Sequence, residues 1–228
     1  MIKFLYDDKF IIVCVKPVGV LSEPFSREKC MPELLKRQTK AYKIDVIHRL
    51  DRNVGGLMIY SKNSKATELL AKMMASHSFK KEYLAVVEGK PQASGVMEDY
   101  LVKDKKNCKV YVGDKTDKNA KYAKLEYTVL GEKKGLSLVK IRLHTGRTHQ
   151  IRVQFASRGF SLVGDTKYGK QDTTANGKTP ISLFSCRLSF LHPISKKPID
   201  CFELPSFSGA FSLFKKELLE LQKTKKPN

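Results

Sequence analysis

The chain has 228 residues, of which 41% are hydrophobic and 29% charged, and its formal net charge is +20. This composition is globular, so disordered and collagen-like chains are excluded, and the length allows a core to form without disulfides. The longest strongly apolar run, residues 10–15, is far shorter than the roughly 20 residues that a membrane-spanning helix needs. Membrane proteins and disulfide scaffolds are therefore excluded as well.

The excess of positive charge is the first clue to a partner. Lysine and arginine number 43 against 23 aspartates and glutamates. Such a field concentrates polyanions, so nucleic acid is the first expected partner and acidic lipid the second. The plain alternative is a lysine-rich organism whose proteins are all somewhat basic.

Cysteine and histidine usage indicates the compartment and the metal content. The five cysteines are odd in number and have no metal-ligand spacing, and Cys14 lies inside an apolar run. We therefore expect a reducing cytoplasm, no structural zinc, and a buried Cys14. Asp7 and Asp8 interrupt the region where a signal peptide would be apolar, which also indicates a cytoplasmic protein.

Short apolar runs bounded by turn residues predict strands along the chain. They are residues 9–16, 56–60, 83–89, 125–130, 136–143, 181–190 and 199–204. Residues 103–124 carry eight lysines and three aspartates and predict a solvated hairpin or loop. Residues 169–179 predict a polar loop, and residues 222–228 a basic tail.

Three helices are expected between these strands. Asn63-Ser64 offers a cap, and apolar residues at Ala66, Leu69, Leu70, Met73 and Met74 form one helical face, which indicates core packing. Thr148 is expected to cap a helix that ends near residue 158, before a glycine. The last helix is expected over 212–221.

The order of these elements predicts the fold class. Strands dominate and do not alternate regularly with helices, which favours α+β over a doubly wound fold. We expect a single domain over residues 1–228, with a central mixed, mainly antiparallel sheet flanked by helices and loops.

The first motif is Ile47-His48-Arg49-Leu50-Asp51-Arg52-Asn53-Val54-Gly55-Gly56. It places one carboxylate between two arginines, and neighbouring arginines stabilise an ionised carboxylate, which can act as a nucleophile. The glycines would let a substrate approach the backbone or would make a tight turn. The alternative is a surface cluster of salt bridges before a strand.

The second motif is Thr145-Gly146-Arg147-Thr148-His149-Gln150-Ile151-Arg152. Backbone N–H groups and a guanidinium at the start of a helix suit phosphate binding. The alternative is an ordinary helix cap with a solvated basic face.

Residues 164–170 imitate a P-loop, but they lack its magnesium-binding hydroxyl and a following helix, so nucleotide binding is not expected.

Together, these motifs resemble the RluA-type RNA pseudouridine synthases. The resemblance rests on His48–Asp51 with Gly56-Leu57, and on Gly146–Arg152 about a hundred residues later. It also includes segments at residues 7–19, 80–89, 164–169 and 183–193, and so covers nearly the whole chain.

The resemblance implies roles for single residues. Asp51 corresponds to the essential aspartate, Tyr83 to the tyrosine that stacks on the uracil, and Arg152 to the basic residue that pairs with the aspartate. Arg49 corresponds to the arginine that helps to displace the base, and the substrate-binding set is Arg49, Arg52, Arg147, His149 and Gln150.

This chain departs from the family at two places. Val54-Gly55-Gly56 stands where the family usually has Thr-Ser-Gly, and Gln154 stands where a histidine is common. These departures bear on substrate preference more than on activity. The chain also starts directly with the catalytic part, so we expect no separate N-terminal RNA-binding domain.

The resemblance implies an enzyme that isomerises uridines in ribosomal or transfer RNA to pseudouridine, with no cofactor and no metal. The expected partner is RNA, not DNA or a membrane, and the expected state is a monomer. A non-catalytic RNA-binding protein on the same scaffold remains an alternative, as does a base-excising glycosylase or nuclease.

Overall fold

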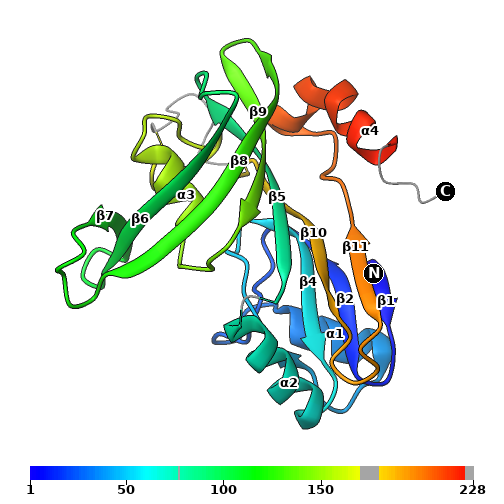
Figure 1. Ribbon diagram of the computed structural model, residues 1–228. Coiled ribbons are helices and arrows are strands. Elements are labelled where there is room, and N and C mark those ends of the chain that lie inside the picture. Colours follow the sequence, from blue (N-terminus) through cyan, green and yellow to red (C-terminus); the bar gives the residue numbers. More distant parts are fainter. Residues whose placement is uncertain (77, 170–179, 224–228) are drawn as a thin grey trace. The chain divides into compact units, whose positions relative to one another are not determined.

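The computed structural model describes residues 1–76, 78–169 and 180–223 (Figure 1). The predicted loop 169–179, apart from Gly169, and the tail beyond Lys223 lie outside the described residues. The chain divides into two compact units, Met1–Glu82 with Phe184–Pro205 and Tyr83–Leu183 with Ser206–Asn228. Each unit is therefore built from two segments that are distant in the sequence.

The first unit holds a mixed sheet and two helices. Its strands are β1 (Phe4–Asp7), β2 (Ile11–Lys16), β3 (Asp45–Val46), β4 (Gly55–Ser61), β10 (Leu183–Leu191) and β11 (Pro198–Phe202). The order is β1-β2-β4-β10, with β3 paired to β4 and β11 to β10. Only the β4–β10 pairing is parallel among these ladders.

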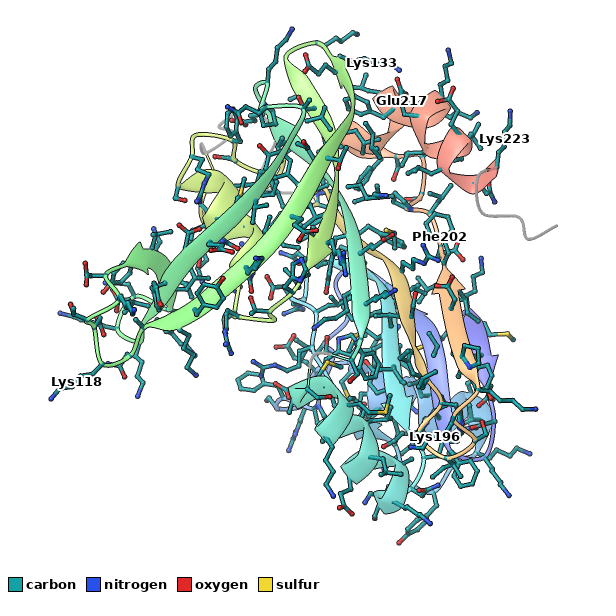
Figure 2. All side chains as sticks on the ribbon, viewed as in Figure 1. Lys118, Lys133, Lys196, Phe202, Glu217 and Lys223 are labelled. Atoms are coloured by element: carbon teal, nitrogen blue, oxygen red, sulfur yellow. The ribbon has the colours of Figure 1, made fainter. Side chains whose placement is uncertain are left out.

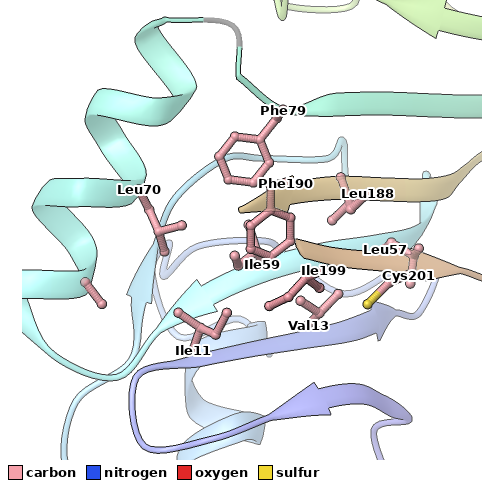
Figure 3. Packing of buried hydrophobic residues seen from close by; sticks show 11 residues of the cluster. Ile11, Val13, Leu57, Ile59, Leu70, Phe79, Leu188, Phe190, Ile199 and Cys201 are labelled. Atoms are coloured by element: carbon pink, nitrogen blue, oxygen red, sulfur yellow. The ribbon is translucent and has the colours of Figure 1, made fainter. Parts of the chain in front are cut away.

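The core of this unit lies between the sheet and helix α2 (Ser64–Ala75), as Figure 3 shows. Leu57 and Ile59 of β4 pack with Leu70 of α2, and the rings of Phe79 and Phe190 stack with centroids 4.8 Å apart. The predicted cap is confirmed, because the Asn63 side chain accepts a hydrogen bond from the Ala66 amide. The helix has few buried positions of its own and depends on this contact.

The opposite face of β4 carries Met58 and Tyr60, because successive strand residues alternate between faces. Tyr60 is fully buried, and its hydroxyl donates to the Ser22 carbonyl 3.2 Å away. Ser22 belongs to the segment that leads into α1 (Met31–Thr39). Cys14, on the same side of β2, is buried, as its sequence surroundings predicted.

The second unit contains a long antiparallel ribbon with a short helix on one side. Its elements are β5 (Lys80–Glu88), β6 (Ser94–Asp104), β7 (Lys109–Gly113), β8 (Lys121–Lys133), β9 (Leu136–Leu143), α3 (Gln150–Ala156), the 3-10 helix η1 (Gly209–Phe214) and α4 (Lys215–Lys223). The strand order is β5-β9-β8-β6-β7. The ladders β6–β7, β6–β8 and β8–β9 are antiparallel.

The predicted fold class is confirmed: α+β with a mixed, mainly antiparallel sheet. Several boundaries differ from the predictions. Residues 103–124 are the ends of β6 and β8 with β7 between them, so they continue the sheet, and helix α1 was not predicted. The final helix begins as 3-10 turns before α4. Within the described ranges, no helix is long and apolar enough to cross a membrane.

Candidate functional site

Asp51 lies in the loop between β3 and β4, and neighbouring segments hold the backbone of this loop. The buried Ser22 hydroxyl donates to the Leu50 carbonyl at 2.7 Å and accepts from the Leu50 amide at 3.0 Å. On the other side, the Gly19 amide donates to the Arg52 carbonyl at 2.8 Å. The carboxylate is therefore carried by a loop that is anchored on both sides of it.

Lys16, at the end of β2, is the third anchor of the Asp51 loop. Its fully buried ammonium donates to the carbonyls of Pro17, Val20 and Arg52 at 3.0, 2.7 and 3.1 Å. Burial lowers the pKa of Lys16 to about 8, although the nearby charge of Asp51 opposes this shift. A positive charge that is close enough to Asp51 to interact with it thus lies beneath the loop.

Arg49 and Arg52 project from the same loop and are largely exposed. Arg49 forms an ion pair with Glu23, and Arg52 pairs with Glu28 at 2.6 Å and donates to the Gly19 carbonyl at 3.2 Å. Exposed pairs of this kind contribute at most about 1 kcal/mol. Both guanidinium groups can therefore exchange their carboxylate partners for phosphate at little cost.

Gly56 explains why this motif ends in glycine. Its φ is +120°, and a Cβ atom built on it would lie 2.4 Å from both the amide nitrogen and the carbonyl oxygen of Ser185. Gly56 and Ser185 are partners in the parallel β4–β10 ladder. Glycine is required at position 56 because the backbone of a neighbouring strand approaches it closely. The substrate approach and the tight turn that the sequence suggests are not the reason.

His48 of the same motif is a packing residue. Burial, together with the charge of Lys81, lowers the pKa of His48 to about 3. The neutral ring accepts a hydrogen bond at Nε2 from the Ile59 amide, 3.3 Å away. His48 is therefore uncharged at neutral pH and holds the start of the loop against β4.

Tyr83 begins the part of β5 that belongs to the second unit, and it is 5% exposed. The following residues from Leu84 to Val87 are fully buried. The backbone of this strand is extended by the Val87–Leu162 bridge and by the Val86 amide, which donates to the Ser182 carbonyl at 3.0 Å. The Tyr83 ring is thus carried by a strand whose backbone is held on both sides.

Arg152 in α3 forms a bidentate ion pair with Asp165. Both contacts, Nε to Oδ2 and Nη2 to Oδ1, are 2.8 Å long, and Asp165 also accepts from the amides of Lys167 and Tyr168 at 3.0 and 3.2 Å. Burial alone would raise the pKa of Asp165, but Arg152 and these amides outweigh it and hold the pKa below its ordinary value. The guanidinium is therefore oriented by a carboxylate that is ionised at neutral pH.

Tyr168 joins Arg152 to His149. Its hydroxyl accepts from the Val110 amide at 3.0 Å and lies 2.7 Å from His149 Nδ1, and the Arg152 guanidinium lies 5.2 Å from the centre of its ring. The hydroxyl thus links strand β7 to the motif in α3. Neither Asp165 nor Tyr168 was selected as a site residue from the sequence.

Gln150 is buried, and both ends of its amide make hydrogen bonds. Its Oε1 accepts from the Thr145 hydroxyl at 2.8 Å and the Arg147 amide at 3.1 Å, and its Nε2 donates to the Lys124 carbonyl at 3.1 Å and Gln154 Oε1 at 3.0 Å. These bonds shape the turn that carries Arg147. This geometry suits a positioning residue better than a residue that touches substrate.

The expected Thr148 cap is wrong. Helix α3 starts at Gln150 after His149, whose backbone is left-handed with φ of 53°, and no side chain caps it. The Arg147 amide donates to Gln150 Oε1, and the Gln150 amide donates to the Arg147 carbonyl, both at 3.1 Å, and these two bonds hold the turn instead. The helix also ends at Ala156, slightly earlier than expected.

Gln154, one of the family departures, is fully buried and well satisfied. Its Nε2 donates to Asp99 Oδ2 at 2.7 Å and to the Met97 carbonyl at 3.2 Å. Asp99 in turn pairs with Arg158 at 2.9 Å. Glutamine at this position connects α3 to β6 and accepts a hydrogen bond from Gln150 of the motif.

No group of three or more potential metal-ligating side chains occurs in the described part of the chain. The predicted site residues fall into two sets. Arg49, Asp51 and Arg52 belong to the first unit, and Tyr83, Arg147, His149, Gln150 and Arg152 belong to the second. Lys16 and Ser22 were also missed as site residues, because the contacts that join them to the Asp51 loop are remote in sequence.

The chain is similar to known pseudouridine synthases. It is 29% identical over 216 residues to the ribosomal large subunit pseudouridine synthase D of Zymomonas mobilis, covering 87% of this chain and 68% of that protein. It is 31% identical over 211 residues to an uncharacterized RNA pseudouridine synthase of Bacillus subtilis, covering 88% and 67%. Another relative, from Borreliella burgdorferi and also described as synthase D, is 31% identical, and the match covers 82% of this chain but 60% of that protein.

A solved structure supports the fold. Human RNA pseudouridylate synthase domain containing 4 superposes with a TM-score of 0.75 at 22% identity, covering 95% of this chain and 93% of that chain. The sequence profile of the RNA pseudouridylate synthases matches residues 10–157, which contain Asp51, Tyr83 and Arg152. The resemblance inferred from the motifs is thereby confirmed, and the chain belongs to the RNA pseudouridylate synthase family, whose members are isomerases that act on RNA.

Proposed function

We propose that this protein isomerises specific uridines in ribosomal or transfer RNA to pseudouridine, with Asp51 as the catalytic aspartate. The observation that carries the proposal is the anchored Asp51 loop, in which Lys16 and Ser22 hold the backbone on either side of the carboxylate. Such anchoring keeps a reacting group in one geometry, which is a major source of catalysis. The names of two relatives favour large-subunit ribosomal RNA.

The reaction breaks the N1–C1′ glycosidic bond and joins C5 of the same uracil to C1′. The hydrogen on C5 is lost as a proton, N1 gains a proton, and no electrons are transferred, so the isomerisation balances without a cofactor. Asp51 acts on the sugar, and Tyr83 stacks on the uracil. The substrate must first turn its uridine out of the RNA, which costs a few kcal/mol.

Arg49 and Arg52 suit this base-flipping step. Their exposed guanidinium groups are paired with Glu23 and Glu28, and RNA phosphates can replace these partners. Arg147 and His149 are proposed to contact the RNA backbone, and Gln150 to position them. Arg152 is proposed to be catalytic, with Asp165 orienting its guanidinium.

The deciding experiment is tritium release from RNA labelled at uridine C5, with ribosomal and transfer RNA transcripts as substrates. We expect release with the wild-type protein and none with Asp51→Asn, whereas the variant should still bind RNA. The matched control is Asp45→Asn, a change at an aspartate in the adjacent strand β3. Equal turnover by Asp51→Asn would exclude Asp51 as the catalytic group.

The same reaction mixtures separate the alternatives. Free uracil or cleaved strands would identify a glycosylase or a nuclease. RNA binding without tritium release from any transcript would favour a non-catalytic RNA-binding protein. We further propose that the protein acts as a cytoplasmic monomer and does not use DNA. Sedimentation tests the monomeric state, and matched DNA substrates test the choice of nucleic acid.

A further inference from the structure

The second unit contains an arm, residues 100–124, formed by the end of β6, by β7 and by the start of β8. One face of the arm packs against α3 over part of its length. Leu101, Val110 and Ala123 pack there in one cluster with Val153 of α3. The other face of these strands, here called the open face, points away from α3 (Figure 1).

Three tyrosines lie on the open face. Tyr100 pairs with Tyr122 across β6 and β8, and Tyr111 of β7 pairs with the residue two positions after Tyr100. Paired residues share a face, as do residues two apart in one strand. Tyr111 is 48% exposed and Tyr122 39% exposed, so their rings are accessible to solvent.

The rings of Tyr100 and Tyr122 also lie against each other, with centroids 5.8 Å apart. The carbonyl of Tyr122 accepts from Arg147 Nε at 2.8 Å, where β9 no longer pairs with β8. This hydrogen bond therefore connects the strand that carries Tyr122 to the motif at residues 145–152, within the same unit.

The arm carries a large excess of positive charge on its faces and turns. Seven lysines form no ion pair with any described residue: Lys103, Lys105, Lys106, Lys109, Lys115, Lys118 and Lys121. Figure 2 shows Lys118 at the far end of the arm.

The aspartates of the arm accept hydrogen bonds from amides two or three residues away. Asp104 and Asp114 accept hydrogen bonds from the amides of Asn107 and Thr116 at 3.0 and 2.8 Å, and Asp117 accepts from the Asn119 amide at 2.8 Å. These carboxylates therefore stabilise the two turns of the arm, and the unpaired lysines dominate its outer charge.

We propose that the open face binds an unpaired stretch of the RNA substrate, with bases stacked on Tyr111 and Tyr122 and phosphates near the lysines of the arm. The inference rests on the proposed function in taking RNA as the ligand. Aromatic platforms with a basic surround are the usual means of binding single strands. In a duplex, the bases stack on one another and their faces are not available to a tyrosine.

The test uses a fluorescent oligomer of about ten uridines, a length within the usual range for such sites. One position carries 2-aminopurine, whose fluorescence falls when it stacks. We expect Tyr111→Leu/Tyr122→Leu to weaken binding roughly tenfold or more and to abolish the fluorescence change. Tyr111→Phe/Tyr122→Phe keeps the rings and should keep both signals.

Tyr42→Leu is the positional control, because Tyr42 is 98% exposed in the first unit. An RNA hairpin without unpaired flanks should bind the leucine variant about as well as it binds the wild-type protein. If the leucine variant retains its affinity for the oligomer, or if the phenylalanine variant loses as much affinity, the proposal is wrong and the face serves another partner.

Two controls separate the effect on RNA binding from effects on folding and on activity. Tyr111→Leu alone changes a half-exposed position in an edge strand, and its circular dichroism and melting temperature should match the wild-type values. The oligomer assay needs no turnover, so it can be repeated with Asp51→Asn. Loss of stacking in the leucine variant together with an absence of tritium release would keep the binding site and reject the proposed reaction.

Discussion

The Arg152 guanidinium and the Asp165 carboxylate meet in a two-point ion pair, 2.8 Å at each contact, across 13 residues of sequence. The arginine side chain is 11% exposed and the aspartate side chain is 0% exposed. A planar pair of this kind fixes direction as well as distance. Asp165 therefore determines where the guanidinium of a proposed catalytic residue can point.

Asp165→Asn should reduce turnover more than RNA binding. The amide cannot reproduce the bidentate pair, so the Arg152 guanidinium loses the contact with Asp165 that fixes its direction, and a largely buried ion pair is broken. We expect kcat to fall roughly tenfold to a hundredfold, as for a misplaced catalytic group, with a smaller change in KM. Steady-state tritium release measures both constants.

Asp99→Asn is the matched control, because Asp99 pairs with Arg158, which lies just beyond α3 and outside the motif. That variant should lose stability without the same fall in kcat. An Asp165→Asn protein with wild-type kcat would show that Asp165 does not position Arg152 for catalysis.

The acid dependence of stability should report the same ion pair. The pKa of Asp165 in the folded state lies below its ordinary value, so its stabilising contribution is complete above about pH 4. That contribution is lost as the pH falls through the lowered pKa, because the native carboxylate then takes up a proton. Urea unfolding of wild type and Asp165→Asn should differ by on the order of 3 kcal/mol near pH 6. The difference should shrink progressively below about pH 4; a constant difference across this range would contradict the assignment.

Lys16→Met should lower both stability and turnover. The substitution leaves three carbonyls without their shared donor, and an unsatisfied buried group costs about 1–3 kcal/mol. Chemical denaturation should show a loss of this order. Because the Asp51 loop loses an anchor, kcat should fall as well, whereas the exposed Lys36→Met should change neither quantity.

The lowered pKa of Lys16 predicts that kcat and the free energy of unfolding change in opposite directions at alkaline pH. Its pKa is lowered to about 8, so wild-type kcat should decrease above that pH as the ammonium loses one of its three donors. Between pH 8 and about 10.4 the unfolded chain holds more protons than the native one. Unfolding free energy should therefore rise with pH in wild type relative to Lys16→Met. The same pH profile for kcat in both proteins would rule out a role for Lys16 in this decrease.

Gly56→Ala should prevent stable folding. The new methyl group would lie 2.4 Å from backbone atoms of Ser185, which cannot move without breaking the β4–β10 pairing. Gly135→Ala is a useful comparison, because Gly135 also has positive φ, +74°, but has no atom within 4 Å of the added carbon. We expect Gly135→Ala to cost roughly 1–2 kcal/mol and Gly56→Ala considerably more. Thermal unfolding would test this order, and equal melting temperatures would contradict the role given to Ser185.

Local patterns were enough to predict much of this protein. The Asn63 cap and the apolar spacing that follows define α2 because a helix repeats every 3.6 residues, and neighbours along the chain supply the contacts. The motif from His48 to Asp51, together with the motif from Gly146 to Arg152, was enough to identify the family. Helix α1 and the left-handed start of α3 at His149 were not foreseen, since neither helix has a side-chain cap that the sequence could indicate.

The sequence by itself determined the fold class, the family, and the residue types available for chemistry, because these depend on periodicity and on short motifs. Only the tertiary structure decided which groups orient them. Lys16 reaches the Arg52 carbonyl across 36 residues, and Gly56 meets Ser185 through a parallel strand pairing. Buried charges and close backbone approaches are satisfied by partners that are distant along the chain, and no local pattern specifies such partners.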